Sequence, residues 1–151
     1  MEKSRIRRAV GAIVQREGQF LLIHKVKMMN SLNGPEKINP RWDFPKGGVK
    51  SSDIDLNSAI LRELKEETGS ENYAIKKMFE DTIVFQFPDK IKEKIGFDSQ
   101  EVTMFLVDFL GHPSELKSQD EEIDDIRFFS KEEVLNMIEF EDSRSFFKNH
   151  V

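Results

Sequence analysis

The fold is decided by residues 42–69, which read WDFPKGGVKSSDIDLNSAILRELKEETG. Residues 55–68 contain neither Gly nor Pro, and they are rich in Leu, Ala, Ile, Glu and Lys. Gly69 follows as a typical C-terminal stop. This pattern predicts a helix of about four turns.

The predicted helix is apolar at its beginning and acidic at its end. At about 100° per residue, one stripe of its surface carries Leu56, Ala59, Ile60, Glu63 and Glu67. Glu66 lies beside this stripe. Buried carboxylates without a charge partner are costly, and carboxylates three and four positions apart repel one another. We therefore expect a divalent-metal site at the end of this helix, because a cation among the carboxylates would remove both penalties.

Length and composition favour a single domain covering residues 1–151. The chain is 38% hydrophobic and contains 13 Phe, which is enough for a packed core. It has no apolar run long enough to cross a bilayer and no signal-peptide pattern at its start. A cytoplasmic protein with no membrane partner is expected.

Other compositional features exclude several kinds of site. Because Cys is absent, disulfides, thiolate zinc sites and cysteine nucleophiles are excluded. The net charge of −5 argues against broad binding to nucleic acid, although a bound metal can still attract a phosphate-bearing substrate. The basic run Arg5, Arg7 and Arg8 is interpreted as a solvated strand face or tail. None of the three histidines is expected to be catalytic.

The rest of the chain indicates an α+β sandwich. Alternating apolar residues predict strands over 6–14, 19–26, 73–87, 101–110 and 123–129, with a short strand around Trp42 and Phe44. Residues 27–41 are interpreted as a long loop, and residues 88–100 as a charged insertion. A capping box of Ser130 and Glu133 predicts a helix to about residue 138, and a last helix is expected over 140–147 with its phenylalanines inward.

Lys46, Gly47 and Gly48 form a turn directly before the acidic helix. Paired glycines let the backbone turn sharply and approach a ligand. Lys46 at this turn is either a phosphate contact or an ordinary exposed loop lysine, and the sequence leaves both open.

Gly48 together with residues 62–69, Arg-Glu-Leu-Lys-Glu-Glu-Thr-Gly, resembles the Nudix box G-x5-E-x7-R-E-U-x-E-E-x-G-U, in which U is apolar. Two positions depart from the box. Ile54 stands where the first Glu is expected, although Asp53 and Asp55 flank it and either could substitute. Ser70 replaces the final apolar residue.

The flanking segments look like the branch that contains diadenosine tetraphosphate hydrolases and RNA 5′-pyrophosphohydrolases. These segments are residues 42–48, 85–88 and 96–100, in that order. The branch often carries an Arg and a Tyr before Phe-Pro that help to hold a nucleotide. Here Val84 and Phe85 stand in their place, so any base contact by Phe85 would be stacking.

The resemblance implies a Nudix-type α/β/α sandwich, with a mixed sheet, the Nudix loop-helix-loop and a C-terminal helix. It also implies Mg²⁺ or Mn²⁺ as the cofactor, which suits hard carboxylate oxygens. The implied metal ligands are Glu63, Glu66, Glu67, the Gly48 carbonyl and a loop carboxylate, for which Glu122 aligns best and Glu121 is the near alternative. Either Glu67 or Glu122 would be the base, and Arg62 would orient a glutamate. Lys46 and Gly47 would meet the substrate phosphates.

The implied activity is hydrolysis of a pyrophosphate bond in a substrate built on a nucleoside diphosphate. We expect a dinucleoside polyphosphate, such as diadenosine tetraphosphate, as the first choice. Removal of pyrophosphate from the 5′ end of RNA is the second, since the acidic net charge and the lack of an extended basic patch disfavour a tight RNA binder. A non-catalytic nucleotide sensor is a third, supported only by Ile54. The oligomeric state stays open.

Overall fold

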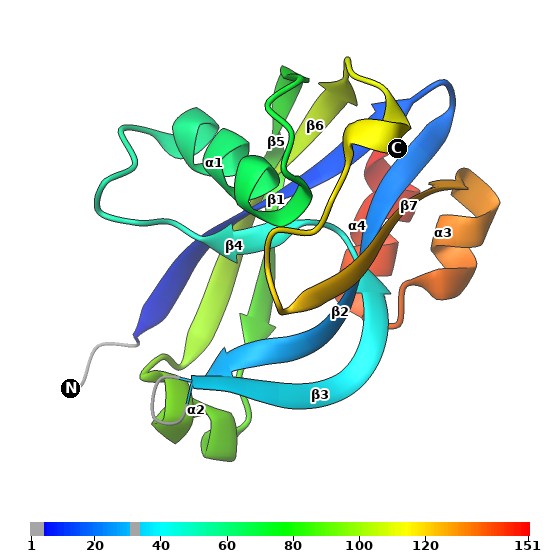
Figure 1. The fold of residues 1–151 in the computed structure, drawn as a ribbon. Coiled ribbons are helices and arrows are strands. Elements are labelled where there is room, and N and C mark those ends of the chain that lie inside the picture. The colour runs from blue at the N-terminus through cyan, green and yellow to red at the C-terminus, as the bar shows by residue number, and fades with distance from the viewer. Residues whose placement is uncertain (1–4, 31–33) are drawn as a thin grey trace.

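The computed structural model describes residues 5–30 and 34–151, which form one mixed sheet with helices on both of its faces (Figure 1). The sheet order is β3-β2-β1-β6-β5, with β4 paired to β1 and β7 paired to β2. β1 runs parallel to β6 and antiparallel to β2 and β4. The strands are β1 (Ile6–Arg16), β2 (Gln19–Asn30), β3 (Gly34–Asp43), β4 (Lys46–Gly48), β5 (Tyr73–Gln86), β6 (Ser99–Phe109) and β7 (Ile123–Ser130).

Four α-helices are present in this part of the chain: α1 (Leu56–Thr68), α2 (Asp89–Ile95), α3 (Lys131–Met137) and α4 (Glu141–His150). A 3-10 turn, η1, covers Pro113–Glu115. No helix among the described residues is long and apolar enough to span a membrane.

The α1 helix begins and ends as its sequence predicts. Asp55 is the N-cap, and its side chain accepts a hydrogen bond of 2.7 Å from the Ser58 backbone N–H. Gly69 ends the helix with φ at 75°, a left-handed conformation that glycine adopts without strain. The expected helix is therefore confirmed.

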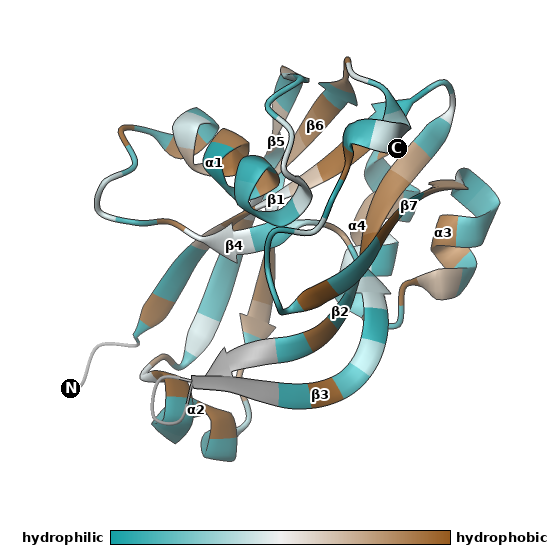
Figure 2. Ribbon diagram, viewed as in Figure 1, coloured by the Kyte–Doolittle hydropathy of each residue, from teal (hydrophilic) through white to brown (hydrophobic). Residues whose placement is uncertain are grey.

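The sheet separates two apolar cores. Ala59, Ile60 and Leu64 of α1 are fully buried on one face. Phe146 and Phe147 of α4 are buried on the other face, so the last helix and its inward phenylalanines are also confirmed. In Figure 2, the central strands carry many hydrophobic residues, drawn in brown, and hydrophobic and hydrophilic residues alternate along α1. The α+β sandwich expected from the sequence is correct.

The loop expected over 27–41 is wrong. β2 continues to Asn30 and β3 starts at Gly34, while residues 31–33 lie outside the described part of the chain. Backbone pairing with β2 overrides the low strand propensity of this stretch. The strand register shifts between Lys25 and Lys27, where residues 38–40 of β3 form a bulge opposite Val26. The bulge includes Pro40, which has no N–H to donate. The charged insertion over 88–100 contains α2, which Gly96 ends.

Candidate active site

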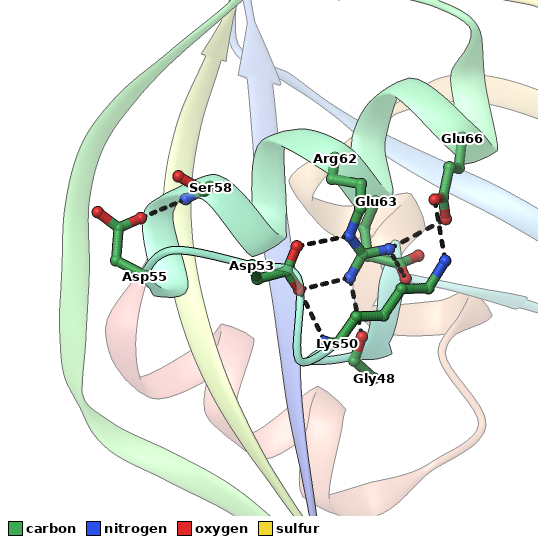
Figure 3. A network of polar contacts seen from close by, with 8 residues as sticks. All are labelled: Gly48, Lys50, Asp53, Asp55, Ser58, Arg62, Glu63 and Glu66. Atoms are coloured by element: carbon green, nitrogen blue, oxygen red, sulfur yellow. Dashed lines mark hydrogen bonds and ion pairs between the residues drawn. The ribbon is translucent and has the colours of Figure 1, made fainter.

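Arg62 is the centre of a polar network between α1 and the loop that precedes it (Figure 3). Its Nε and Nη2 donate to the two Asp53 carboxylate oxygens at 2.8 and 2.9 Å. Nη2 also donates to the Gly48 carbonyl at 2.9 Å. Nη1 donates to Glu63 at 2.9 Å and to Glu66 at 3.1 Å. Arg62 therefore contacts two of the helix glutamates and also the Gly48 end of β4. Its role in orienting a catalytic glutamate stays a prediction.

Asp53, one residue before the position of the missing Nudix-box Glu, pairs with Arg62. Its side chain is 5% exposed, and the hydrogen bonds from Arg62 and from the Lys50 backbone N–H lower its pKa to about 2. Ile54 is 92% exposed, so it takes no part in the network. Of the two flanking carboxylates left open by the sequence, Asp53 pairs with Arg62 and Asp55 caps α1.

Gly47 leaves room for the Glu63 carboxylate. A Cβ at position 47 would lie 2.0 Å from Glu63 Cδ, which is closer than two atoms can approach. Glu63 is nearly buried, and this burial raises its pKa despite the hydrogen bond from Arg62. The close approach explains why a glycine stands directly before Gly48.

Glu67 is the most constrained carboxylate of the helix. It is 6% exposed, and among the described residues its Oε2 has no hydrogen-bond partner. Burial raises its pKa well above the usual range, and the charge of Glu63 adds to this effect. Asp120 and Glu122 raise the pKa of Glu67 further, while Lys25 opposes them. A buried carboxylate oxygen without a partner is a group that a cation would satisfy.

Glu122 approaches the acidic end of α1 from the start of β7. Its backbone carbonyl accepts hydrogen bonds from the N–H groups of Val26 and Lys27, at 2.8 and 3.3 Å, which fixes the loop. The negative charge of Glu122 raises the pKa of Glu67. Glu121 instead has a side chain that is 66% exposed and lies 3.9 Å from the Lys27 ammonium. The geometry therefore favours Glu122 over Glu121 as the loop carboxylate.

Arg7 is a candidate site residue that the sequence does not single out. Its guanidinium packs against Gly48, where an added Cβ would lie 2.6 Å from Nη2, and it donates to the Gln100 side chain. Burial lowers the pKa of Arg7, while the charges of Glu63 and Glu122 raise it. The expectation of a solvated basic run is wrong for Arg7, because this strand end lies under the carboxylates Glu63, Glu66, Glu67 and Glu122, here called the acidic cluster. The sequence carries no signal that separates it from Arg5 and Arg8.

Lys46 is not an exposed loop lysine. It begins β4, its side chain is 12% exposed, and its ammonium donates to Ser143 Oγ at 2.8 Å. It also forms an ion pair with Asp43 at 3.3 Å and lies 5.1 Å from the centroid of the Phe85 ring. Phe85 is in edge-to-face contact with Phe140. Lys46 and Phe85 thus lie next to each other beside α4. Two residues that contact the same substrate would have to be close in this way.

The acidic residues would have to rearrange to hold a divalent metal. In the described residues, no group of three or more His, Asp or Glu side chains is arranged to hold an ion as it stands. Arg62 donates to Glu63 and Glu66, so a metal would have to compete with it for these two carboxylates. Glu67 Oε2 has no such competitor. The donors are hard oxygens at one end of one helix, and they fit a hard cation once Glu63 and Glu66 turn toward it.

A family model described as NUDIX domain matches residues 5–149. The chain belongs to the Nudix family. This Nudix protein is 29% identical over 142 residues to an RNA pyrophosphohydrolase of Nitratiruptor sp., covering 93% of this chain and 88% of the relative. It is 32% identical over 99 residues to an RNA pyrophosphohydrolase of Campylobacter jejuni, covering 64% and 63% of the two chains. The alignment thus spans less than two thirds of the Campylobacter protein.

Solved structures agree on the Nudix fold. A NUDIX hydrolase from Nitrosomonas europaea has a TM-score of 0.71 at 15% identity, over 98% of this chain and 88% of that one. A C. elegans Ap4A hydrolase in a binary complex has a TM-score of 0.65 at 19% identity, over 94% and 93% of the two chains. The protein is a Nudix hydrolase, and pyrophosphohydrolase activity is the coarse function that its family and relatives support.

Proposed function

We propose that this Nudix hydrolase removes pyrophosphate from the 5′ end of triphosphorylated RNA, with Mg²⁺ or Mn²⁺ as cofactor. The observation that carries the proposal is a cationic ladder on β2 and β3, made of Lys25, Lys27, Lys37 and Arg41. The names of the Nitratiruptor and Campylobacter relatives point to the same substrate. This reverses the order of the two enzyme substrates expected from the sequence.

The cationic ladder places like charges directly opposite each other. Lys25 pairs with Arg41 and Lys27 pairs with Lys37 across the two antiparallel strands. Like charges at such positions repel one another. Glu121 lies 3.9 Å from the Lys27 ammonium, and the Arg41 guanidinium lies 4.8 Å from the centroid of the Phe140 ring, so part of this charge already has a partner. An anion lying along the strands would relieve the repulsion that remains. Lys25 acts electrostatically on Glu67, so the ladder begins beside the acidic cluster and follows the curved β2–β3 arm (Figure 1). An RNA chain has phosphates to follow it, whereas a short dinucleotide reaches only its start.

The residues that would hold the metal are Glu63, Glu66, Glu67, Glu122 and the Gly48 carbonyl. When bound, the cation would neutralise phosphate charge and lower the pKa of an attacking water. Arg62 donates hydrogen bonds to the Gly48 carbonyl and to Glu63, which would hold these two ligands in place.

Side chains of the protein would carry out proton transfer and phosphate binding. Glu67 or Glu122 is the proposed acceptor of a proton from the attacking water. The raised pKa of Glu67, to which the charge of Glu122 contributes, supports this assignment. Arg7, under the acidic cluster, and Lys46, on the α4 side, offer positive charge to the phosphate oxygens. Gly47 keeps the backbone close to Glu63 and open to the substrate.

A dinucleoside polyphosphate is the second candidate substrate. The observation that favours it is the contact of Phe85 with the Lys46 ammonium and with Phe140, an aromatic corner on which a nucleobase could stack. The Nudix family match and the names of the relatives argue against the non-catalytic alternative. Asp53, which pairs with Arg62, supports the same reading by offering a carboxylate next to Ile54. The cytoplasmic location and the single-domain extent of residues 1–151 stay predictions.

The experiment compares kcat/KM for 5′-triphosphorylated RNA and for diadenosine tetraphosphate at equal Mg²⁺. The proposal predicts a preference for RNA that weakens as salt rises. The double variant Lys27→Gln/Lys37→Gln should raise KM for RNA and lower the salt dependence of binding by about one to two ionic contacts, with little change for the dinucleotide. Lys65→Gln/Lys148→Gln, with the same change of charge elsewhere, is the control. Equal losses on both substrates would contradict the proposed ladder.

A further inference from the structure

Ser143 and Asp43 form a cage around the Lys46 ammonium, and we infer that they are positioning residues that aim it at the substrate. This inference rests on the proposed contact between Lys46 and phosphate. It adds that the C-terminal helix α4 sets the geometry of that contact. The cage is defined as Ser143 Oγ at 2.8 Å and the two Asp43 oxygens at 3.3 and 3.4 Å from Lys46 Nζ.

Ser143 is a polar residue on the buried face of α4. The other buried residues of that helix are Phe146 and Phe147, so the position belongs to the apolar stripe that docks on the sheet. Ser143 itself is 0% exposed. A buried hydroxyl is stable only when it is hydrogen-bonded, and Lys46 supplies that bond. The stripe is thus interrupted at the one position that faces Lys46.

The same turn of α4 also positions Asp43, because it packs against Phe44, the residue that follows Asp43. Phe147 lies four residues after Ser143, and its ring centroid is 5.6 Å from that of Phe44. The Phe44 backbone N–H donates to Asp43 Oδ1 at 2.8 Å, which fixes the carboxylate. Docking of α4 therefore sets both sides of the cage in a single packing arrangement.

The cage restricts how Lys46 can act. An ammonium has three N–H donors. One bonds to Ser143, and a second is shared by the two Asp43 oxygens, which leaves one for a phosphate oxygen. Asp43 also offsets the charge of Lys46, so this lysine acts as an aimed hydrogen-bond donor more than as a free cation. Without the cage, the flexible lysine stem would spread over many rotamers.

The test is a double-mutant cycle on Ser143→Ala and Lys46→Met, read as kcat/KM with Mg²⁺ and 5′-triphosphorylated RNA. Each single variant should lose about tenfold or more, as expected for a hydrogen bond to a charged group. The double variant should be no worse than Lys46→Met, because Ser143 acts only through Lys46. Losses that multiply, or wild-type kcat/KM in either single variant, would overturn the inference.

Two further variants separate positioning from packing. Ser143→Cys replaces the hydroxyl with a slightly larger thiol that is a poor acceptor, so it should stay close to the wild-type melting temperature yet lose activity as Ser143→Ala does. Ser145→Ala, two residues along the same helix, removes an exposed hydroxyl that bonds to Glu141, and it should leave kcat/KM unchanged. Full activity in Ser143→Cys would reduce Ser143 to a space-filling role and refute the cage.

A readout without substrate keeps this inference distinct from the proposed function. In the wild type, the caged Lys46 ammonium protons should exchange slowly enough to give a ¹⁵N-resolved NMR signal, and Ser143→Ala should lose it. An unchanged signal in Ser143→Ala contradicts the cage. If the wild type hydrolyses no triphosphorylated RNA, the proposed function fails, and the NMR comparison still decides whether Ser143 holds Lys46.

Discussion

The Asp53 carboxylate meets the Arg62 guanidinium in two hydrogen bonds, 2.8 Å from Oδ1 to Nε and 2.9 Å from Oδ2 to Nη2. This pair offers a carboxylate next to Ile54, which stands at the box position where a Glu is expected. Because Arg62 also donates to Gly48, Glu63 and Glu66, the loop carboxylate helps to fix the positions of these three residues.

Asp53→Ala should lower kcat by about 10- to 100-fold, the usual loss when a partner behind a metal-binding residue is removed. Arg62 would then be free to turn away from Gly48 and the glutamates. Moving the carboxylate to the box position, in Asp53→Ala/Ile54→Glu, should restore part of the rate. Asp55→Ala is the matched control, since it removes only the helix cap and should lower the melting temperature with little effect on kcat. Steady-state rates that leave Asp53→Ala at the wild-type level would refute this role.

Glu67→Gln should abolish most activity while making the metal-free protein more stable. The rate should fall by about two to four orders of magnitude if Glu67 is the base. Stability should rise near neutral pH, because a neutral amide replaces a buried carboxylate whose pKa burial and Glu63 have raised. Calorimetry without metal and turnover with Mg²⁺ measure the two effects. Glu71→Gln, at an exposed position, should change neither, and a less stable Glu67→Gln would contradict the burial argument.

Gly47→Ala should destabilise the protein by about 1–3 kcal/mol, the usual cost of overpacking. The new Cβ would collide with the Glu63 carboxylate. Removing that carboxylate in Gly47→Ala/Glu63→Ala should recover stability without recovering activity. Denaturant unfolding provides the comparison, and additive losses in the double variant would show that the two residues do not compete for space.

His150 should make stability depend on pH. Its ring nitrogens lie 2.8 Å from Asp81 Oδ2 and 2.9 Å from the Phe146 carbonyl, and these bonds, with Asp81 first, raise the pKa of His150 above 6.5. The protonated form is favoured in the fold, so its stabilisation is complete below the unfolded pKa and is lost as pH rises through the folded value. Asp81→Asn should therefore lower the melting temperature near pH 5.5 and have little effect near pH 9. Equal shifts at both pH values would contradict the assignment.

The sequence predicted what local periodicity and capping determine. Helix α1 and its caps follow from the run between Asp55 and Gly69, and α3 follows from Ser130 and Glu133. The β2–β3 arm was missed because its Asn, Gly, Pro and Lys residues have low strand propensity, and only pairing with β2 makes them a strand. The cationic ladder could not be predicted either, because it depends on which residues of β2 and β3 lie opposite each other.

The candidate site was predicted where its residues are close in sequence. Arg62, Glu63, Glu66 and Glu67 fall in one helix, so their spacing is enough to group them. The contributions of Arg7, Asp53 and Ser143 depend on contacts between distant segments or on the course of a loop. No periodicity encodes such contacts, and they appear only when the strands and α4 are placed together.

The most direct test of the account is the release of pyrophosphate from 5′-triphosphorylated RNA, measured with diadenosine tetraphosphate at equal concentration, with and without Mg²⁺. We expect Mg²⁺-dependent turnover that favours RNA and that Glu67→Gln abolishes. An enzyme that turns over the dinucleotide but leaves the RNA 5′ end intact, or that keeps its rate in Glu67→Gln, would contradict it.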